Sequence, residues 1–182
     1  HWKDRGYTDI LDIGCAEGFY AVGMARLWPV ATVHAYDIEP AALELCRQLA
    51  RTNGVSERVR VEGACTADTL RQFPFRGRAL ILSDCEGYEA QLFTAETMPA
   101  LAKADIVIEV HEQAGLGFLE KVEALAAATH RATRIRTQPR QAGESIFLSK
   151  FSDFDQVLIL SEARDGVLGH KPQWWLVLES RA

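Results

Sequence analysis

A short apolar run that ends in a loop of small residues constrains the fold of this chain more than any other segment. The run Asp9–Ile13 leads into Gly14-Cys15-Ala16-Glu17-Gly18, after which the sequence takes a helical pattern. A second apolar run, Thr32–Asp37, follows and ends in an acid. Glycines let the backbone approach a ligand closely, and an acid after the second strand can accept hydrogen bonds from both hydroxyls of a ribose. The segment therefore predicts a strand–helix–strand unit that binds a nucleoside.

The loop does not fit a ligand that is held through phosphates. A dinucleotide fingerprint needs glycine at its first, third and sixth positions, and Ala16 and Phe19 stand where the last two would be. No Gly-Lys-Ser/Thr follows the turn, and the Glu17 carboxylate would compete for the N–H groups that a phosphate uses. We therefore expect an adenosine cofactor without phosphate, S-adenosylmethionine. A glycine-rich turn with no ligand stays open as the alternative.

Apolar runs alternate with helical patterns along most of the chain. The strands that we expect are Asp9–Ile13, Thr32–Asp37, Val59–Gly63, Ala79–Asp84, Asp105–Val110, Arg131–Arg136 and Trp174–Glu179. A helix should begin near Pro40, end at Asn53-Gly54 and place Leu45 and Leu49 on its buried face. Phe154–Ala163 is expected to be an inserted helix or strand. Such alternation predicts an α/β fold with a doubly wound, mostly parallel sheet that binds ligands at the carboxyl ends of its strands.

Two segments resemble motifs of known methyltransferases. Asp12–Tyr20 resembles motif I of class I S-adenosylmethionine-dependent methyltransferases, and Asp37 matches the acid that follows their second strand. Asp84-Cys85-Glu86-Gly87-Tyr88-Glu89 resembles the Asp-x-Glu-Gly-x-Glu segment of FkbM-type methyltransferases, and Ile106–His111 is similar to that family's next strand. The resemblance covers residues 9–112. It implies a Rossmann-like methyltransferase fold with a seven-stranded sheet and a reversed last strand, and S-adenosylhomocysteine as the product.

The cofactor contacts expected from this resemblance lie at the ends of the first three strands. Glu17 would face the methionine moiety, Asp37 would take the ribose, and Ile38 would pack on the adenine. Asp12 would meet the amino group of the donor indirectly. The expected cofactor-binding residues are Asp12, Gly14, Cys15, Ala16, Glu17, Gly18, Asp37, Ile38, Ala64 and Cys65.

Three side chains after the fourth and fifth strands are the candidate catalytic residues: Asp84, Glu86 and His111. Methyl transfer to an alcohol requires loss of the hydroxyl proton, and a histidine beside a carboxylate is a suitable acceptor. Asp84 would orient the substrate or belong to the base system, or alternatively contact the cofactor's amino group or cap the turn. His111 could also be structural. Glu89 is expected to be solvated or to cap a helix, and Glu109 would need a buried partner.

We expect an enzyme that methylates oxygen on a small-molecule or sugar-containing hydroxyl. N-methylation is the enzymatic alternative, and a catalytically silent cofactor-binding scaffold is the alternative from another class. The same acids and imidazole offer mixed oxygen and nitrogen ligands to a divalent metal ion. Their spacing matches no dedicated metal motif, so a metal is not favoured.

Composition limits the partners. The chain has 182 residues, of which 48% are hydrophobic, and a formal net charge of −5 without a long basic cluster, which disfavours nucleic acid as a substrate. No apolar stretch has the length of a membrane span, and no signal peptide is visible. The four cysteines show no Cys-x-x-Cys spacing, so we expect a reduced, cytoplasmic protein. The acceptor and the oligomeric state stay open.

We expect residues 1–182 to form a single S-adenosylmethionine-dependent methyltransferase domain. The chain contains no internal repeat or linker that would divide it. It begins with His1 instead of Met, so an N-terminal segment that helps to cap the substrate is expected to be missing.

Overall fold

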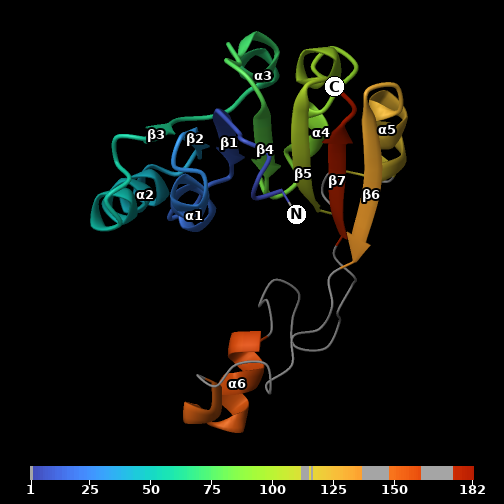
Figure 1. The fold of residues 1–182 in the computed structure, drawn as a ribbon. Helices are drawn as coiled ribbons and strands as arrows, with labels where there is room; N and C mark the ends of the chain where they lie inside the picture. Colours follow the sequence, from blue (N-terminus) through green and yellow to red (C-terminus); the bar gives the residue numbers. More distant parts are fainter. Residues whose placement is uncertain (1, 112–114, 116, 137–147, 161–173) are drawn as a thin grey trace.

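A seven-stranded sheet forms the centre of the molecule in the computed structural model, which describes residues 2–111, 115, 117–136, 148–160 and 174–182. The strands are β1 (Asp9–Ile13), β2 (Thr32–Tyr36), β3 (Val59–Glu62), β4 (Ala79–Ser83), β5 (Ala104–Val110), β6 (His130–Arg136) and β7 (Trp174–Ser180). Their order in the sheet is β3-β2-β1-β4-β5-β7-β6 (Figure 1). The strands from β3 to β5 pair in parallel, and β7 runs antiparallel to both β5 and β6. The predicted doubly wound sheet with a reversed last strand is confirmed.

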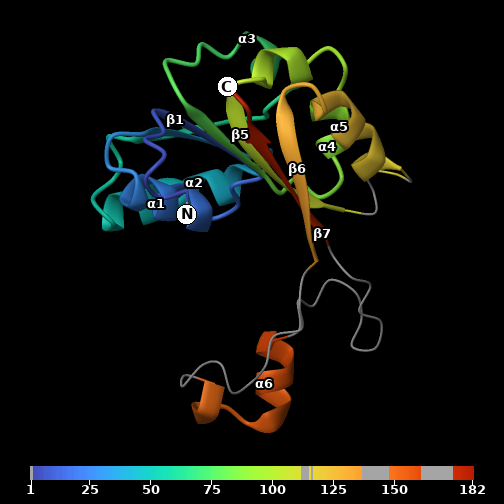
Figure 2. The ribbon, with the colours of Figure 1, turned by 45° about the vertical axis from the view of Figure 1, so that its right-hand side comes forward.

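Helices cover both faces of the sheet. They are α1 (Phe19–Leu27), α2 (Pro40–Thr52), α3 (Ala67–Gln72), α4 (Glu89–Leu92), α5 (Phe118–Ala126) and α6 (Asp153–Leu160), with short 3-10 turns at Met98–Leu101 and Leu148–Lys150. Helices α1 and α2 lie on one face, and α3, α4 and α5 lie on the other (Figure 2). In both views α6 lies away from the sheet. Every helix in the described part of the chain is too short or too polar to span a bilayer.

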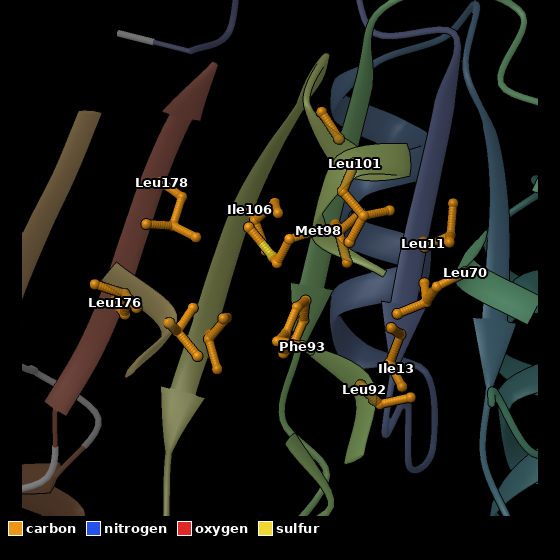
Figure 3. Packing of buried hydrophobic residues seen from close by; sticks show 14 of the residues in the cluster. Leu11, Ile13, Leu70, Leu92, Phe93, Met98, Leu101, Ile106, Leu176 and Leu178 are labelled. Atoms are coloured by element: carbon orange, nitrogen blue, oxygen red, sulfur yellow. The ribbon is translucent and has the colours of Figure 1, made fainter. Parts of the chain in front are cut away.

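The strands alternate their side chains between two apolar layers. On β1, Ile10 packs into the layer beneath α1 and α2, whereas Leu11 and Ile13 pack into the layer beneath α3, α4 and α5. Leu11 and Leu70 belong to the second layer, as does Ile106 of β5 (Figure 3). Because both faces of the sheet are covered, β1 and β4 are buried at every residue instead of at alternate residues. This rigid sheet fixes the positions of the loops at its carboxyl edge.

Helix α2 begins and ends where the sequence predicts. Pro40 is its first residue, the Glu39 side chain accepts a hydrogen bond from the Ala41 N–H, and Gly54 follows with φ 66°. The predicted buried face needs one correction. Leu45 is 51% exposed, and Leu43 packs toward the sheet in its place.

The C-terminal part agrees with the sequence where it can be compared. Phe154 lies in α6, so the inserted segment is a helix and not a strand. Residues 161–173, which include the end of the expected segment at Ala163, lie outside the described residues.

Candidate functional site

The loop after β1 is fixed to the neighbouring strands by its backbone. The N–H groups of Gly14 and Cys15 both donate to the Tyr36 carbonyl at 2.9 Å. Gly14 has φ 83°, and a Cβ atom there would lie 1.8 Å from the Asp84 carbonyl oxygen. Glycine is therefore required at position 14 because the end of β4 passes against the loop. The sequence predicted close approach to a ligand here, and the structure adds this second steric reason.

Asp37 joins the loop to the end of β2. Its Oδ2 accepts a hydrogen bond from the Ala16 N–H at 2.9 Å, and its Oδ1 accepts one from the Glu39 N–H at 2.9 Å. Ala16 has φ 46°, a left-handed conformation that costs energy for a residue with a Cβ atom. The Asp37 carboxylate compensates that cost because it holds the turn in place. Both carboxylate oxygens also lie at the carboxyl edge of the sheet.

Gly18 closes the loop against α2. It has φ 91° directly before α1, and a Cβ atom at this position would lie 2.6 Å from Cys46 Sγ. The Gly18 N–H donates to the Cys15 carbonyl at 2.8 Å, and Cys15 is itself buried. The two predicted loop glycines are thus both needed for the packing of the loop, whatever it binds.

Asp12 is a buried acid at the base of this loop. The residue is 1% exposed, and its Oδ2 has no hydrogen-bond partner among the described residues. Burial is the main reason that the pKa of Asp12 is raised to about 8, and the negative charges of Asp84 and Asp37 add to the effect. Such an atom is suited to a cationic or hydrogen-bonding partner that arrives with a ligand.

The remaining expected cofactor residues line the same edge of the sheet. Ile38, next to Asp37, is 84% exposed, so its apolar side chain is accessible to a ligand at this edge. Glu17 and Ala64 are also exposed, whereas Cys65 is buried and its thiol pKa is raised to about 12 by that burial. Cys65 is therefore a packing residue and not a nucleophile.

A hollow of about 590 Å³ lies at β2, β3 and α3 and extends to Asp9 at the start of β1. Its lining residues include Tyr36, Glu62 and Phe73. None of the three candidate catalytic residues lines it. The hollow and the candidate catalytic residues are therefore separate features of the described chain.

The three candidate catalytic side chains converge as the sequence predicts. Asp84 directly follows β4, and His111 directly follows β5. His111 Nε2 lies 3.5 Å from Asp84 Oδ1 and 3.4 Å from Glu86 Oε2. Glu86 has φ 53°, so the turn after β4 carries backbone strain at a residue that faces the ring. One potential ligand atom from each of the three residues lies within 4.8 Å of the other two.

Glu89 also belongs to this group, contrary to the expectation of a solvated or capping residue. It is 0% exposed at the start of α4, and its Oε1 lies 2.8 Å from His111 Nδ1. The same oxygen accepts a hydrogen bond from the Cys85 N–H at 3.2 Å. The only sequence signal for this role is that Glu89 is the last acid of the Asp84–Glu89 segment. Glu89 lies in α4, whereas its partner His111 follows β5, so spacing along the chain could not reveal the contact.

The contact between Glu89 and His111 shifts the pKa values of both groups. Burial alone would raise the pKa of Glu89, but the hydrogen bond with His111 brings it below its ordinary value. Burial alone would lower the pKa of His111, but Glu89, Glu86 and Asp84 together raise it. Glu109, which was expected to need a buried partner, lies in β5 opposite Trp175. Glu89 is the acid bonded to His111 Nδ1.

The arrangement can hold a proton or a cation beside a nucleoside-binding loop. An imidazole bonded to a buried carboxylate has a fixed orientation, and its second nitrogen faces two further acids. Asp84 links the two parts of the site because its carbonyl touches the Gly14 position while its carboxylate faces His111.

Comparison with known proteins identifies the family and the fold. A family model described as a methyltransferase domain matches residues 4–109, more than half of the chain. The O-methyltransferase TomG from Streptomyces achromogenes, solved with S-adenosylmethionine, aligns with a TM-score of 0.62 over 98% of this chain and 75% of that one, at 17% identity. An O-methyltransferase from Bacillus cereus, solved with S-adenosylhomocysteine, aligns with a TM-score of 0.60 over 98% of this chain and 76% of that one, at 16% identity. At these identities the two structures show the fold.

A curated relative matches over a shorter stretch. The release factor glutamine methyltransferase from Thermosynechococcus vestitus is 37% identical over 59 residues, which are 32% of this chain and 20% of that protein. The chain thus covers about a fifth of the length of this relative. Because the family model covers most of the sheet and the loop after β1, the chain belongs to the methyltransferase domain family.

Proposed function

We propose that this protein is an S-adenosylmethionine-dependent methyltransferase of the FkbM type that methylates a hydroxyl group on a small molecule or a sugar-containing product. One observation carries the proposal. The His111 ring is held between Glu89 on one side and Asp84 and Glu86 on the other, directly beside the loop after β1. A hydroxyl acceptor needs such proton-accepting groups, whereas a neutral amine does not.

The loop and its surroundings fit S-adenosylmethionine. The cofactor carries an ammonium and a sulfonium charge, and this edge of the sheet offers Asp12 and Asp37 and no phosphate-type loop. Asp37 would bind the ribose hydroxyls, and the exposed Ile38 side chain would cover the adenine. The buried Oδ2 of Asp12 would receive the donor's amino group, directly or through water. TomG and the Bacillus cereus enzyme, which were solved with the cofactor or its product, support this choice.

The reaction divides between the cofactor and the residues of this chain. When bound, S-adenosylmethionine supplies a methyl group that is already activated on sulfur. The acceptor hydroxyl would have to be held close to that methyl group and to lose its proton as its oxygen takes the methyl, with S-adenosylhomocysteine as the product. Asp84 would orient the hydroxyl, and His111 Nε2 or Glu86 would accept its proton. Glu89 would keep the ring in one orientation.

Calorimetric titration of the purified chain with S-adenosylmethionine, S-adenosylhomocysteine and NAD tests the cofactor. We expect micromolar binding of the two sulfur nucleosides, no binding of NAD, and loss of binding in Asp37→Ala. Glu44→Ala on the solvent face of α2 is the matched control and should bind normally. Binding of NAD alone would contradict the proposal.

Transfer of a labelled methyl group to a panel of hydroxyl and amine acceptors tests the chemistry. We expect transfer to hydroxyl compounds, and loss of turnover with retained cofactor binding in His111→Asn. Glu86→Gln provides a second variant because Glu86 is exposed, so folding is not at risk. Transfer to amines alone would point to N-methylation. Cofactor binding without transfer to either class would point to a silent scaffold.

A further inference from the structure

Four titratable side chains meet at the ends of β4 and β5. His111 is 7% exposed and Glu89 is 0% exposed, so both lie inside the protein. Asp84 is partly buried, and Glu86 reaches the surface. Potential ligand atoms from Asp84, Glu86 and His111 come within 4.8 Å of one another although the residues belong to two separate strand ends. Their convergence was expected because parallel strands end at one edge of a sheet, and the structure adds the short distances between them.

The hydrogen bond with Glu89 determines which nitrogen of the His111 ring carries the proton and which carries the lone pair. An ionised carboxylate only accepts hydrogen bonds, so His111 Nδ1 carries the proton in the 2.8 Å contact with Glu89 Oε1. In the neutral ring the lone pair then resides on Nε2, the nitrogen that faces Asp84 and Glu86 at 3.5 and 3.4 Å. A carboxylate bonded to the far nitrogen of a histidine is the usual outer partner of a metal-bound imidazole.

We propose that Asp84, Glu86 and His111 bind one divalent metal ion of the Mn²⁺ class, with Glu89 as the positioning residue behind the imidazole. Two carboxylates at such short range repel each other unless positive charge lies between them. The 3.4–3.5 Å separations exceed those of direct charge-assisted hydrogen bonds, which leaves room for each atom to adjust around an ion.

The mixture of donors selects the class of ion. Magnesium and calcium prefer oxygen ligands throughout, whereas an imidazole nitrogen suits zinc and other transition-metal ions, and two carboxylates also suit manganese, which is itself a transition metal. Three protein ligands leave coordination positions open, as in catalytic metal sites. If the proposed O-methylation holds, an acceptor hydroxyl would occupy one of them and lose its proton more easily. With the ion bound, His111 Nε2 would be a ligand and not the proton acceptor, and the proton would pass to solvent. That role rests on the proposed function, but binding of the ion itself does not.

Metal binding can be measured without any methyl acceptor. The full chain, freed of metal by a chelator, is titrated with Mn²⁺ by calorimetry and by the loss of the free-ion signal in electron paramagnetic resonance. We expect one ion per chain, with Zn²⁺ competing and Mg²⁺ binding more weakly. Glu86→Gln should weaken Mn²⁺ at least tenfold, and Glu89→Gln, which removes no ligand, should weaken it about ten- to hundredfold.

A second histidine–glutamate pair supplies the matched control. His34 Nδ1 lies 2.8 Å from Glu62 Oε1, the same separation as in the pair of His111 and Glu89. His34 belongs to none of the possible metal-ligand groups in the described part of the chain. Glu62→Gln should therefore leave Mn²⁺ affinity unchanged.

The outcomes separate this inference from the proposed function because S-adenosylhomocysteine binding is titrated on the same samples. Absence of Mn²⁺ and Zn²⁺ binding in a chain that still binds the nucleoside overturns the metal site and leaves the methyltransferase assignment standing. Ion binding that Glu86→Gln and Glu89→Gln leave unchanged also overturns it, because the ion then sits elsewhere. Mn²⁺ binding that both variants weaken, in a chain that binds no nucleoside, supports the metal site and counts against the proposed function.

Discussion

Buried acids have different kinds of partners at the two edges of the sheet, namely the amino edge, where the parallel strands begin, and the carboxyl edge, where they end. At the amino edge, Asp105 is 0% exposed and accepts hydrogen bonds from the Tyr7 hydroxyl at 2.7 Å, the Arg5 guanidinium at 2.8 Å and the Ser180 N–H at 2.9 Å. Arg78 adds a further ion pair at 3.3 Å. These contacts hold the pKa of Asp105 below its ordinary value even though burial alone would raise it. Permanent cations neutralise the acid and tie the N-terminal segment to β5 and β7.

At the carboxyl edge the buried acids do not have permanently charged partners. Glu89 is paired with an imidazole, which gains and loses protons near neutral pH, and Asp12 has a buried oxygen without a partner in the described residues. Ala16 and Glu86 hold left-handed backbone conformations there. The comparison indicates that the amino edge stabilises the fold, whereas the carboxyl edge retains charge and strain for binding.

Removal of the Asp105 carboxylate should have the largest effect on stability. Asp105→Asn removes the buried counter-charge of Arg78 and one of the two carboxylates that pair with Arg5, which keeps Glu179. Breaking a buried pair in this way costs about 3–5 kcal/mol. Urea unfolding monitored by circular dichroism measures the loss. If the edges are distinct, the folded fraction should bind S-adenosylhomocysteine normally. Asp4→Asn, at an exposed acid nearby, is the control and should leave the midpoint unchanged.

The pH dependence of stability should have opposite signs at the two edges. Asp12 has a pKa of about 8 in the folded protein, well above that of the unfolded chain, so its contribution is fully present below about pH 4 and is lost as pH rises toward 8. The slope is about 1.4 kcal/mol per pH unit, or about 3 kcal/mol between pH 5 and pH 7. Asp12→Asn should flatten this region.

Asp105 provides the opposite case. Its lowered pKa means that its stabilisation is present above the unfolded pKa near 4 and is lost as pH falls below it. Urea midpoints measured from pH 3 to pH 9 on Asp12→Asn and Asp105→Asn separate the loss of stability at rising pH from the loss at falling pH. An unchanged slope between pH 5 and pH 7 in Asp12→Asn would show that Asp12 is ionised in the folded protein.

Substitutions at two glycines, one in the loop after β1 and one in α1, test whether the conformation of that loop is needed for cofactor binding. Gly14→Ala places a Cβ atom 1.8 Å from the Asp84 carbonyl at a φ of 83°, so the loop must move, at a cost of about 1–3 kcal/mol. The displacement should also abolish cofactor binding. Gly23→Ala in α1 meets no atom within 4 Å and should stabilise the helix by up to about 1 kcal/mol. Normal nucleoside affinity in Gly14→Ala would show that the loop does not take part in cofactor binding.

The sequence predicted the part of the structure that local pattern controls. Strand and helix positions followed from apolar periodicity, and the convergence of Asp84 with His111 followed because parallel strands end at one edge. The boundaries differ by a residue at most strands, as in β2, which ends at Tyr36 and not at Asp37. Motif resemblance predicted the reversed last strand, which periodicity alone could not orient.

What the sequence could not predict depends on contacts between distant elements. Glu89 was expected to be solvated or to cap a helix because its charge and its position early in a helix are typical of such residues. Its burial depends on His111, which approaches from β5, and no pattern within either segment encodes that distance. The error at Leu45 and Leu43 has the same kind of cause. Which of the two is buried depends on the angle at which α2 lies on the sheet.

The two histidine–glutamate pairs give the prediction with the smallest expected effect, which is the difference in stability cost between Glu62→Gln and Glu89→Gln. Glu62 is 43% exposed, so its contact with His34 is well screened, and Glu62→Gln should cost less than about 1 kcal/mol. Glu89→Gln keeps the shape of its side chain but removes a fully buried negative charge from beside His111, so its cost should be larger. Chemical denaturation of both variants near neutral pH measures the difference. Equal costs would mean that the separation of 2.8 Å, which the pairs share, determines their strength. Unequal costs would mean that burial at the carboxyl edge determines it.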